Sequence, residues 1–240
     1  MRRFSQTFIT ICLFIASILV TGELRATHLV GSDMYYEDLG GGNYNIILKV
    51  YRECGPANTN GTGFDDIIYF GVFNSATNQF INEYDVFLNA ITIQDVPVIM
   101  TNPCGIPPTD LCIDEATFTQ QMYLPDGPDG YTVVWQRCCR NPTISNLNTI
   151  GGNPPGMTST VTIPGTNQIN PVNNSSPVWE EFPPVAICAN FEFFFDHGAI
   201  DSDGDELVYS FCAPFHGADG NDPAPNPPYN PPYIPVPYAP

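Results

Sequence analysis

Three aspartates at alternate positions are the part of the sequence best suited to chemistry. Asp201, Asp203 and Asp205 place three carboxylates close together, with Gly204 in the turn between them. Calcium binds the oxygen atoms of such acidic loops, and neighbouring carboxylates repel one another unless a cation lies between them. The sequence therefore predicts a calcium site in this loop. The further ligands that we expect are Asp196 and Glu206.

The loop departs from the EF-hand pattern, which requires glycine at its sixth position and glutamate at its twelfth. Counted from Asp201, those positions hold Glu206 and Cys212. The alternative to a calcium site is a solvated turn, in which aspartate side chains accept hydrogen bonds from backbone amides.

Two other kinds of site are weaker in the sequence. Adjacent acids at positions 65–66 and 114–115 have the residue types of a glycosidase, but sequence spacing does not give the separation of two carboxylates. Trp135 and Trp179 have aromatic faces that could stack on a sugar, although strand aromatics are more often buried. No phosphate-binding loop, Gly-x-Ser-x-Gly elbow or His-Glu-x-x-His motif is present.

Residues 1–26 have the layout of a secretory signal peptide. Two arginines follow Met1, an apolar stretch covers residues 8–20, and Gly22 and Ala26 are candidate cleavage positions. The apolar stretch is shorter than the about 20 residues of a transmembrane helix. We therefore expect export and cleavage rather than a membrane anchor, and no membrane span after cleavage.

Seven cysteines remain after the signal peptide, and in an oxidising compartment they predict a framework of disulfides. We expect one bridge between Cys104 and Cys112, because the two residues flank a short loop. A second bridge is expected between Cys188 and Cys212, which flank an apolar stretch and the acidic loop.

The pairing of the other cysteines stays open between two partners. Cys54 would pair with Cys138 or Cys139, because adjacent residues on a strand point to opposite faces and one cysteine is left over. Zinc is the alternative to disulfides, but no Cys-x-x-Cys pair is present and the three histidines are scattered.

Short apolar or alternating stretches, separated by Gly, Pro, Asn and Asp, predict an all-β fold. The expected strands cover residues 44–51, 66–73, 90–100, 116–124, 131–139 and 158–163. No stretch combines a helical period with helix caps. We therefore expect residues 27–172 to form a disulfide-bearing β-sandwich.

A second unit is expected over residues 173–240. Predicted strands over residues 187–195 and 207–212 enclose the acidic loop, as at the start of a second immunoglobulin- or cadherin-like β-sandwich. From residue 223 the chain is rich in Pro, Asn and Tyr, a composition that favours polyproline II. We expect this unit to be incomplete and the natural chain to continue beyond Pro240.

The charge of the chain excludes several classes of partner. The formal net charge is -18, from 7 basic and 25 acidic residues. Cleavage after residue 26 removes three of the basic residues and one of the acidic ones, which leaves four cations and a net charge of -20. Nucleic acids and anionic membrane surfaces require clustered Lys and Arg, so neither is an expected partner.

Several segments carry a resemblance to a known family. VYREC at residues 50–54, QRCCRN at 136–141 and DHGAIDSDGDELVYSFCAP at 196–214 resemble the N-terminal region of large exported surface proteins of Bacteroidota. These proteins are often labelled gliding-motility-associated or PKD-domain-containing. The acidic stretch is also similar to cadherin-like and other immunoglobulin-like repeats, in which acids at such positions are calcium-linked.

The resemblance implies export through the type IX pathway and a role in adhesion or surface structure. We expect a non-enzymatic module, secreted or held on the extracellular side of the outer membrane. Its partners would be neighbouring domains of a longer chain and surface glycans or proteins. A carbohydrate-binding module that uses Trp135, Trp179 or the Tyr-rich tail is the first alternative, and a secreted hydrolase is the second.

Overall fold

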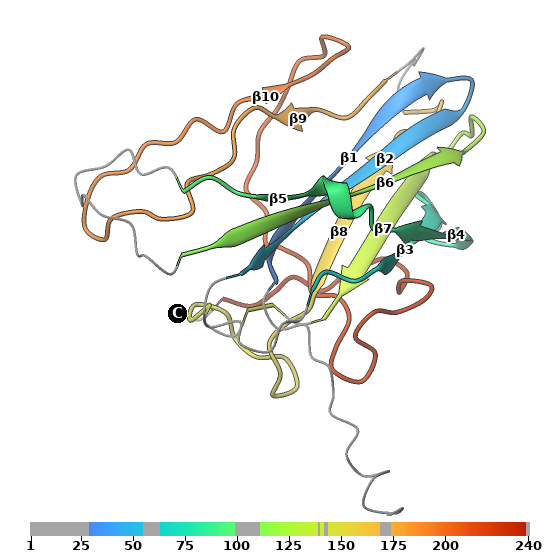
Figure 1. The fold of residues 1–240 in the computed structure, drawn as a ribbon. Coiled ribbons are helices and arrows are strands. Elements are labelled where there is room, and N and C mark those ends of the chain that lie inside the picture. Colours follow the sequence, from blue (N-terminus) through green and yellow to red (C-terminus); the bar gives the residue numbers. More distant parts are fainter. Residues whose placement is uncertain are drawn as a thin grey trace, which may run out of the picture.

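The chain folds into antiparallel β-sheets in this computed structural model (Figure 1). The structure describes residues 29–54, 63–98, 111–138, 140–141, 144–168 and 174–238. The elements in these ranges are β1 Leu29–Gly40, β2 Asn43–Glu53, β3 Ile67–Asn74, β4 Phe80–Phe87, the 3-10 helix η1 Ala90–Thr92, β5 Ile93–Asp95, β6 Ile113–Tyr123, β7 Tyr131–Arg137, β8 Met157–Ile163, β9 Val178–Trp179 and β10 Ala199–Ile200. No α-helix occurs in them, which confirms the prediction of an all-β chain.

Some predicted features lie outside this part of the chain. They are the signal peptide at residues 1–26 and the cysteines Cys104 and Cys139. Within the described ranges, no helix has the length and apolar character that a membrane crossing requires.

Two four-stranded sheets share one hydrophobic core. The first sheet has the strand order β1-β2-β6-β5 and the second has the order β4-β3-β7-β8. Side chains alternate between the two faces of a strand, and in β2 Ile46 and Leu48 take the inward positions. They join Phe70 of β3, Phe118 of β6 and Val133 of β7 in one buried cluster. The core therefore lies between the two sheets.

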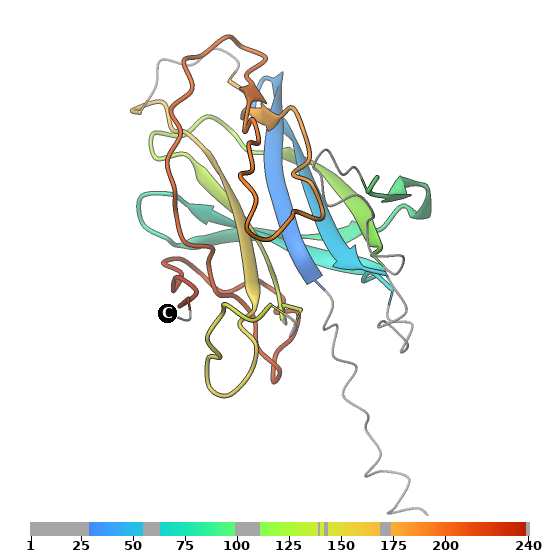
Figure 2. The ribbon, with the colours of Figure 1, turned by 90° about the vertical axis from the view of Figure 1, so that its left-hand side faces the viewer.

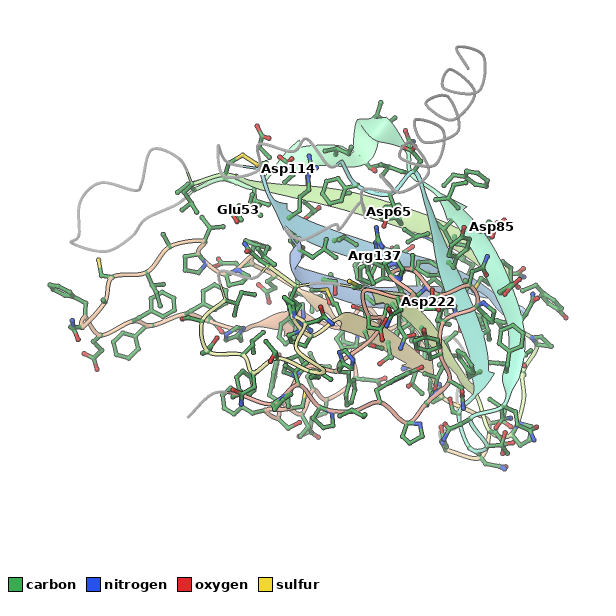
Figure 3. All side chains as sticks on the ribbon, turned by 90° about the horizontal axis from the view of Figure 1, so that it is seen from below. Glu53, Asp65, Asp85, Asp114, Arg137 and Asp222 are labelled. Carbon is green, nitrogen blue, oxygen red and sulfur yellow. A yellow bond between two sulfur atoms is a disulfide. The ribbon has the colours of Figure 1, made fainter. Side chains whose placement is uncertain are left out.

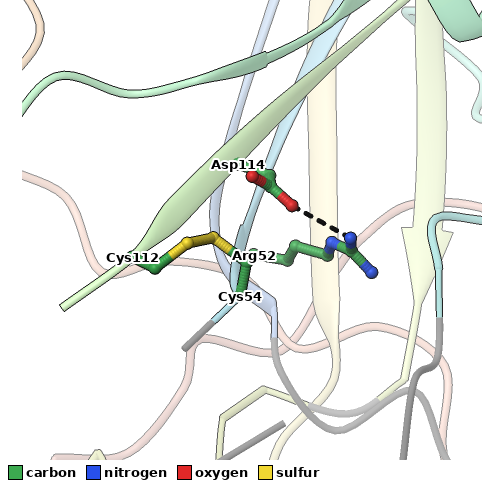
Figure 4. Close-up of a disulfide and its surroundings, with 4 residues drawn as sticks. All are labelled: Arg52, Cys54, Cys112 and Asp114. Atoms are coloured by element: carbon green, nitrogen blue, oxygen red, sulfur yellow. Dashed lines mark hydrogen bonds and ion pairs between the residues drawn. A yellow bond between two sulfur atoms is a disulfide. The ribbon is translucent and has the colours of Figure 1, made fainter. Parts of the chain in front are cut away.

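One disulfide ties neighbouring strands of the first sheet together (Figure 4). Cys54 follows β2 and Cys112 precedes β6, and the strand register pairs Glu53 with Ile113 immediately beside them. The two cysteine Cα atoms lie 5.0 Å apart, within the usual range for a disulfide. The predicted pairings of Cys54 with Cys138 or Cys139 and of Cys104 with Cys112 are therefore wrong.

The other described cysteines also differ from the predicted pairing. Cys138 and Cys188 are each disulfide-bonded, whereas Cys212 is a free, exposed thiol. The predicted bridge between Cys188 and Cys212 is therefore wrong. Cys212 lies in a stretch that forms no strand, so no sheet register brings it opposite Cys188.

Three of the four cations beyond residue 26 are largely buried arginines with partners inside the protein. The Arg137 guanidinium lies 2.7 Å from a carboxylate oxygen of Asp65 (Figure 3), and Arg52 lies 2.9 Å from Asp114. Arg140 instead donates to the backbone carbonyls of Gly156 and Phe215. Since buried charges need partners, these contacts hold the guanidinium groups inside.

Residues 174–212 form an arm that lies along the outer face of the first sheet (Figure 2). The arm begins at the free edge of β1, where the backbone amide of Ser176 donates to the carbonyl of Tyr36. The Tyr36 hydroxyl donates to Asn174. Further along, Val185 packs on the buried outer-face residues Tyr51 and Ile113. These contacts hold the arm against a face that would otherwise be exposed.

Little of the arm forms β-strands. Its strand pairing is limited to β9 and β10, so the predicted strands over residues 187–195 and 207–212 are wrong. A strand needs a neighbour for its backbone groups, and the described residues provide none at these positions. Phe194 is 82% exposed and Phe211 is fully exposed, so their apolar character does not reflect burial in a sheet.

Residues 213–238, the C-terminal segment, pack against the edge of β8. A β-bridge joins Phe215 to Thr158, and Val236 is fully buried. Gly156 and Gly217 allow the close approach, because a Cβ atom at Gly156 would lie 2.1 Å from the carbonyl oxygen of Ala218. The Pro-rich stretch is thus attached to the body formed by the two sheets.

Acidification should weaken this attachment through His216. Its Nδ1 accepts a hydrogen bond of 2.9 Å from the Gly156 amide, so the imidazole must be neutral there. Burial lowers the pKa of His216 below its usual 6.5; nearby Asp219 acts in the opposite direction, and Arg140 adds to the lowering. Below about pH 6.5 the unfolded chain takes up the proton first, so stability falls as the pH drops.

Urea unfolding at pH 7.5 and pH 5.0 measures this effect against the variant His216→Asn. The Asn amide oxygen can accept from Gly156 without titrating, so the loss of stability between the two pH values should be smaller in the variant. If both proteins lost the same stability between pH 7.5 and pH 5.0, protonation of His216 would not be the cause of the pH dependence.

Candidate functional site

A groove of about 470 Å³ lies between the outer face of the first sheet and the arm. Its floor is formed by residues of three adjacent strands, β1, β2 and β6, and all of their charged members face outward. Its wall is formed by residues 178–183 and His197 of the arm. The volume is within the range of small-molecule sites, which is about 300–1,000 Å³.

The floor carries an ordered polar cluster centred on Glu115. This carboxylate accepts a hydrogen bond of 2.9 Å from the Gln94 side chain and lies 3.5 Å from the Lys49 ammonium. The Tyr51 hydroxyl also hydrogen-bonds to Glu115, and burial raises the pKa of Tyr51. Glu115 is therefore a buried carboxylate held by several donors.

Asp33 lies beside this cluster, on β1 opposite Lys49 of β2. Burial raises the pKa of Asp33, the attraction of Lys49 opposes this effect, and Glu115 adds a smaller repulsion. The ionised form of Asp33 thus carries a net cost in the folded protein. A cleft that contains an ionisable group with a perturbed pKa is a candidate binding site.

Aromatic side chains form the wall of the groove. The Phe182 ring packs on the Tyr51 ring at 4.7 Å between centroids. Trp179 is half-exposed, and its ring meets the edge of His197 at 6.0 Å. His197 in turn packs against Phe195 at 4.5 Å. Trp179 also packs on Tyr209, at 6.3 Å between ring centroids. Ring contacts therefore hold the wall, and about half of the Trp179 side chain stays exposed.

The serine and the histidine among the described lining residues of the groove are each engaged with other groups. Ser32 is one of its lining residues, but its hydroxyl is hydrogen-bonded to Ser159 and donates to the Met157 sulfur on β8. The ring contacts of His197 are with Trp179 and Phe195. The side chains that line the groove offer a ligand hydrogen bonds, charge and aromatic contact.

The predicted calcium loop adopts the alternative geometry, a turn capped by an aspartate. One Asp201 carboxylate oxygen accepts from the amides of Asp203, Gly204 and Asp205, at 2.9 to 3.1 Å. Asp203 accepts from the Ser175 amide at 2.6 Å. The acidic loop thus fastens the arm to its own first residues.

The five predicted ligands do not gather around one point in the described residues. The potential ligand atoms that lie within 4.8 Å of one another belong instead to Cys54, Cys112 and Asp114. Two of these are the sulfurs of the disulfide, which cannot act as thiolates. Calcium binding by Asp196, Asp201, Asp203, Asp205 and Glu206 stays a prediction.

The two tryptophans have different environments. Trp135 is 2% exposed and belongs to the core between the sheets, which confirms the expectation of burial and excludes it as the sugar-stacking residue of the alternative. Trp179 lines the groove, as a ligand-stacking residue would. Asp33 and Lys49 were not predicted as site residues, and Glu115 was considered only as one of the adjacent acids at positions 114–115. Each occupies an outward position on a strand.

Comparisons with known proteins found no family model, no curated protein and no solved structure that matches this chain. The residues of the groove are therefore the basis for a proposed function.

The variant Asp33→Asn should raise the melting temperature at pH 7.5. The folded pKa of Asp33 is above that of the unfolded chain, so stability falls as the pH rises through this interval. The variant lacks this carboxylate and therefore does not lose this stability. At a pH below both the folded and the unfolded pKa of Asp33, the melting temperatures of the variant and the parent should converge.

Thermal melting at pH 7.5 and pH 3.5 tests this expectation, with Asp85→Asn as the control. Asp85 lies exposed on β4 and its substitution should leave the melting temperature nearly unchanged. A lower melting temperature for Asp33→Asn at pH 7.5 would mean that the attraction of Lys49 outweighs the cost of burial.

Proposed function

We propose that this chain is a non-enzymatic, ligand-binding module of an exported surface protein, folded as a disulfide-bearing β-sandwich. The observation that carries the proposal is the groove, which combines an accessible tryptophan with fixed carboxylates beside a rigid sheet. The arrangement of the two sheets around one core supports the sandwich. The role of the module would be adhesion or surface structure.

The state of the cysteines supports export. Cys54, Cys112, Cys138 and Cys188 are all disulfide-bonded, and structural disulfides persist in oxidising compartments outside the cytosol. A surface exposed to extracellular conditions needs such covalent support. Secretion, or retention on the extracellular side of the outer membrane, is therefore part of the proposal.

Neighbouring domains are part of the same proposal. Phe194, Val208 and Phe211 project from the arm with almost their whole side chains exposed. In a longer chain these side chains would be buried against a neighbouring domain. Calcium bound by the Asp201 loop would stiffen that junction.

A chelator experiment tests the calcium part of the proposal. If calcium binds the loop, adding it to the metal-free chain raises the melting temperature, EDTA reverses the rise, and Asp203→Ala abolishes it. The control is Asp85→Ala, which is remote from the loop on β4. A melting temperature that calcium leaves unchanged would contradict calcium binding.

Carbohydrate binding is the second candidate function, and the half-exposed Trp179 favours it. Aromatic faces stack on the apolar faces of sugars, while carboxylates accept hydrogen bonds from their hydroxyl groups. A hydrolase is less favoured, because Glu115 is already engaged by Lys49, Gln94 and Tyr51.

Adhesion assays test the proposed function directly. Beads that carry the purified chain should be retained on surfaces coated with extracellular glycans or proteins, and beads that carry Trp179→Ala should be retained at least tenfold less. Bonds in the coating should remain intact. Release of cleaved sugar or peptide by the chain, but not by the variant, would overturn the non-enzymatic proposal.

A further inference from the structure

The charge of the groove is strongly unbalanced. Two carboxylates, Asp33 and Glu115, lie on its floor, and two more, Glu180 and Glu181, lie on its wall. Lys49 also lines the groove, but its ammonium group already lies 3.5 Å from a carboxylate oxygen of Glu115. The field inside the groove therefore favours a cation, because converging carboxylates in a concave site focus the potential.

The rest of the chain cannot neutralise this charge. Beyond the signal peptide the cations are Lys49 and three arginines. Those arginines are held by Asp114, by Asp65 and by the carbonyls of Gly156 and Phe215. The counter-charge for the groove must come from another molecule.

The aromatic wall is suited to the same ligand. A cation is attracted to the face of a tryptophan within about 6 Å of the ring centre. Trp179 is 49% exposed, and the two glutamates that follow it, Glu180 and Glu181, are exposed and line the groove with it. A ring face and hydrogen-bond acceptors for an N–H donor therefore lie along one wall.

We propose that the groove binds lysine or arginine side chains of an extended basic segment in a partner protein. This inference rests on the proposed function as a binding module and names the ligand class of that site. A neutral sugar gains nothing from the excess of carboxylates. A quaternary ammonium has no N–H to donate to them, whereas Lys and Arg combine charge, N–H donors and an apolar stem.

Titration of the full chain with an octalysine or octaarginine peptide tests the inference through Trp179 fluorescence and calorimetry. The double variant Glu180→Gln/Glu181→Gln and the single variant Trp179→Ala should each weaken binding at least tenfold. Both changes are at exposed positions, so the fold should be kept, which the melting temperature verifies. The matched control is Glu192→Gln, an exposed acid of the same arm that does not line the groove, and it should change binding less than twofold.

Salt separates groove binding from diffuse attraction to an acidic protein. Between 50 and 300 mM NaCl the affinity of the parent should fall, while the difference between the parent and Trp179→Ala should persist, since contact with a ring is screened little. A glycan array and an octaglutamate peptide are run alongside as the other ligand classes.

Each outcome is decisive for the inference. Loss of peptide binding in the groove variants but not in Glu192→Gln supports it. Equal peptide binding by all variants, or no peptide binding, overturns it. If glycans bind in a Trp179-dependent way and basic peptides do not, the inference fails while the proposed function stands. Turnover of a substrate would instead overturn the proposed function.

Discussion

Replacing Phe118 by alanine is expected to lower the free energy of unfolding by about 4 kcal/mol. Phe118 takes an inward position of β6 and is 1% exposed, in the cluster that the two sheets share. Truncation removes the ring from the middle of close-packed strands, and the sheets cannot collapse around the cavity without breaking their pairing. For a chain of this size the melting temperature should fall by roughly 10 °C.

Urea unfolding of Phe118→Ala beside Phe194→Ala provides the measurement and its control. Phe194 undergoes the same change of side chain at an exposed position of the arm, so its stability should change by about 0.5 kcal/mol or less. If the two variants lost equal stability, the arm would bear as much of the folding energy as the core between the sheets.

Removal of the disulfide between Cys54 and Cys112 should have an effect of similar size. The bridge closes a loop with a sequence separation of 58 residues, for which the chain-entropy relation gives about 4 kcal/mol. The neighbouring backbone bond, from the Cys54 amide to the Cys112 carbonyl at 2.9 Å, can persist when both cysteines become serine. The loss of stability should therefore come mainly from the greater conformational freedom of the unfolded chain.

The double variant Cys54→Ser/Cys112→Ser is compared with Cys212→Ser under non-reducing conditions. Cys212 is free and exposed, so its substitution should leave the urea midpoint unchanged. If Cys212→Ser lowered the urea midpoint more than the double variant did, the bridge between β2 and β6 would not have the proposed role in stability.

The strands of the core were predictable, because their residues show the alternation that burial on one face requires. β2, β3, β6, β7 and β8 lie close to the ranges expected from the sequence. β1 and β4 were missed, since Asp33, Glu37 and Asp38 in β1 and Glu83 and Asp85 in β4 interrupt the apolar pattern. Within the described part of the strand predicted over residues 90–100, residues 90–92 form the 3-10 helix and residues 93–95 form β5.

The pairing of cysteines and the groove were not predictable from local spacing. Cys54 meets Cys112 only because β2 and β6 are neighbours in the sheet, whereas short loops favoured other pairs. The groove joins strand residues to arm residues, from Val178 onward, that lie more than 60 positions further along the chain than Glu115. Outward-facing charges on strands, such as Asp33 opposite Lys49, were the one local signal for it.

The C-terminal segment also determines how this protein behaves when many copies are crowded together. β8 ends its sheet, and an open strand edge is a template for pairing with another molecule. Here the edge is covered by a segment rich in proline, which lacks an amide donor and cannot extend the ladder. At the other edge of that sheet, β4 presents Glu83 and Asp85 to solvent. Both edges thus oppose edge-to-edge association of the sheets when the protein is concentrated.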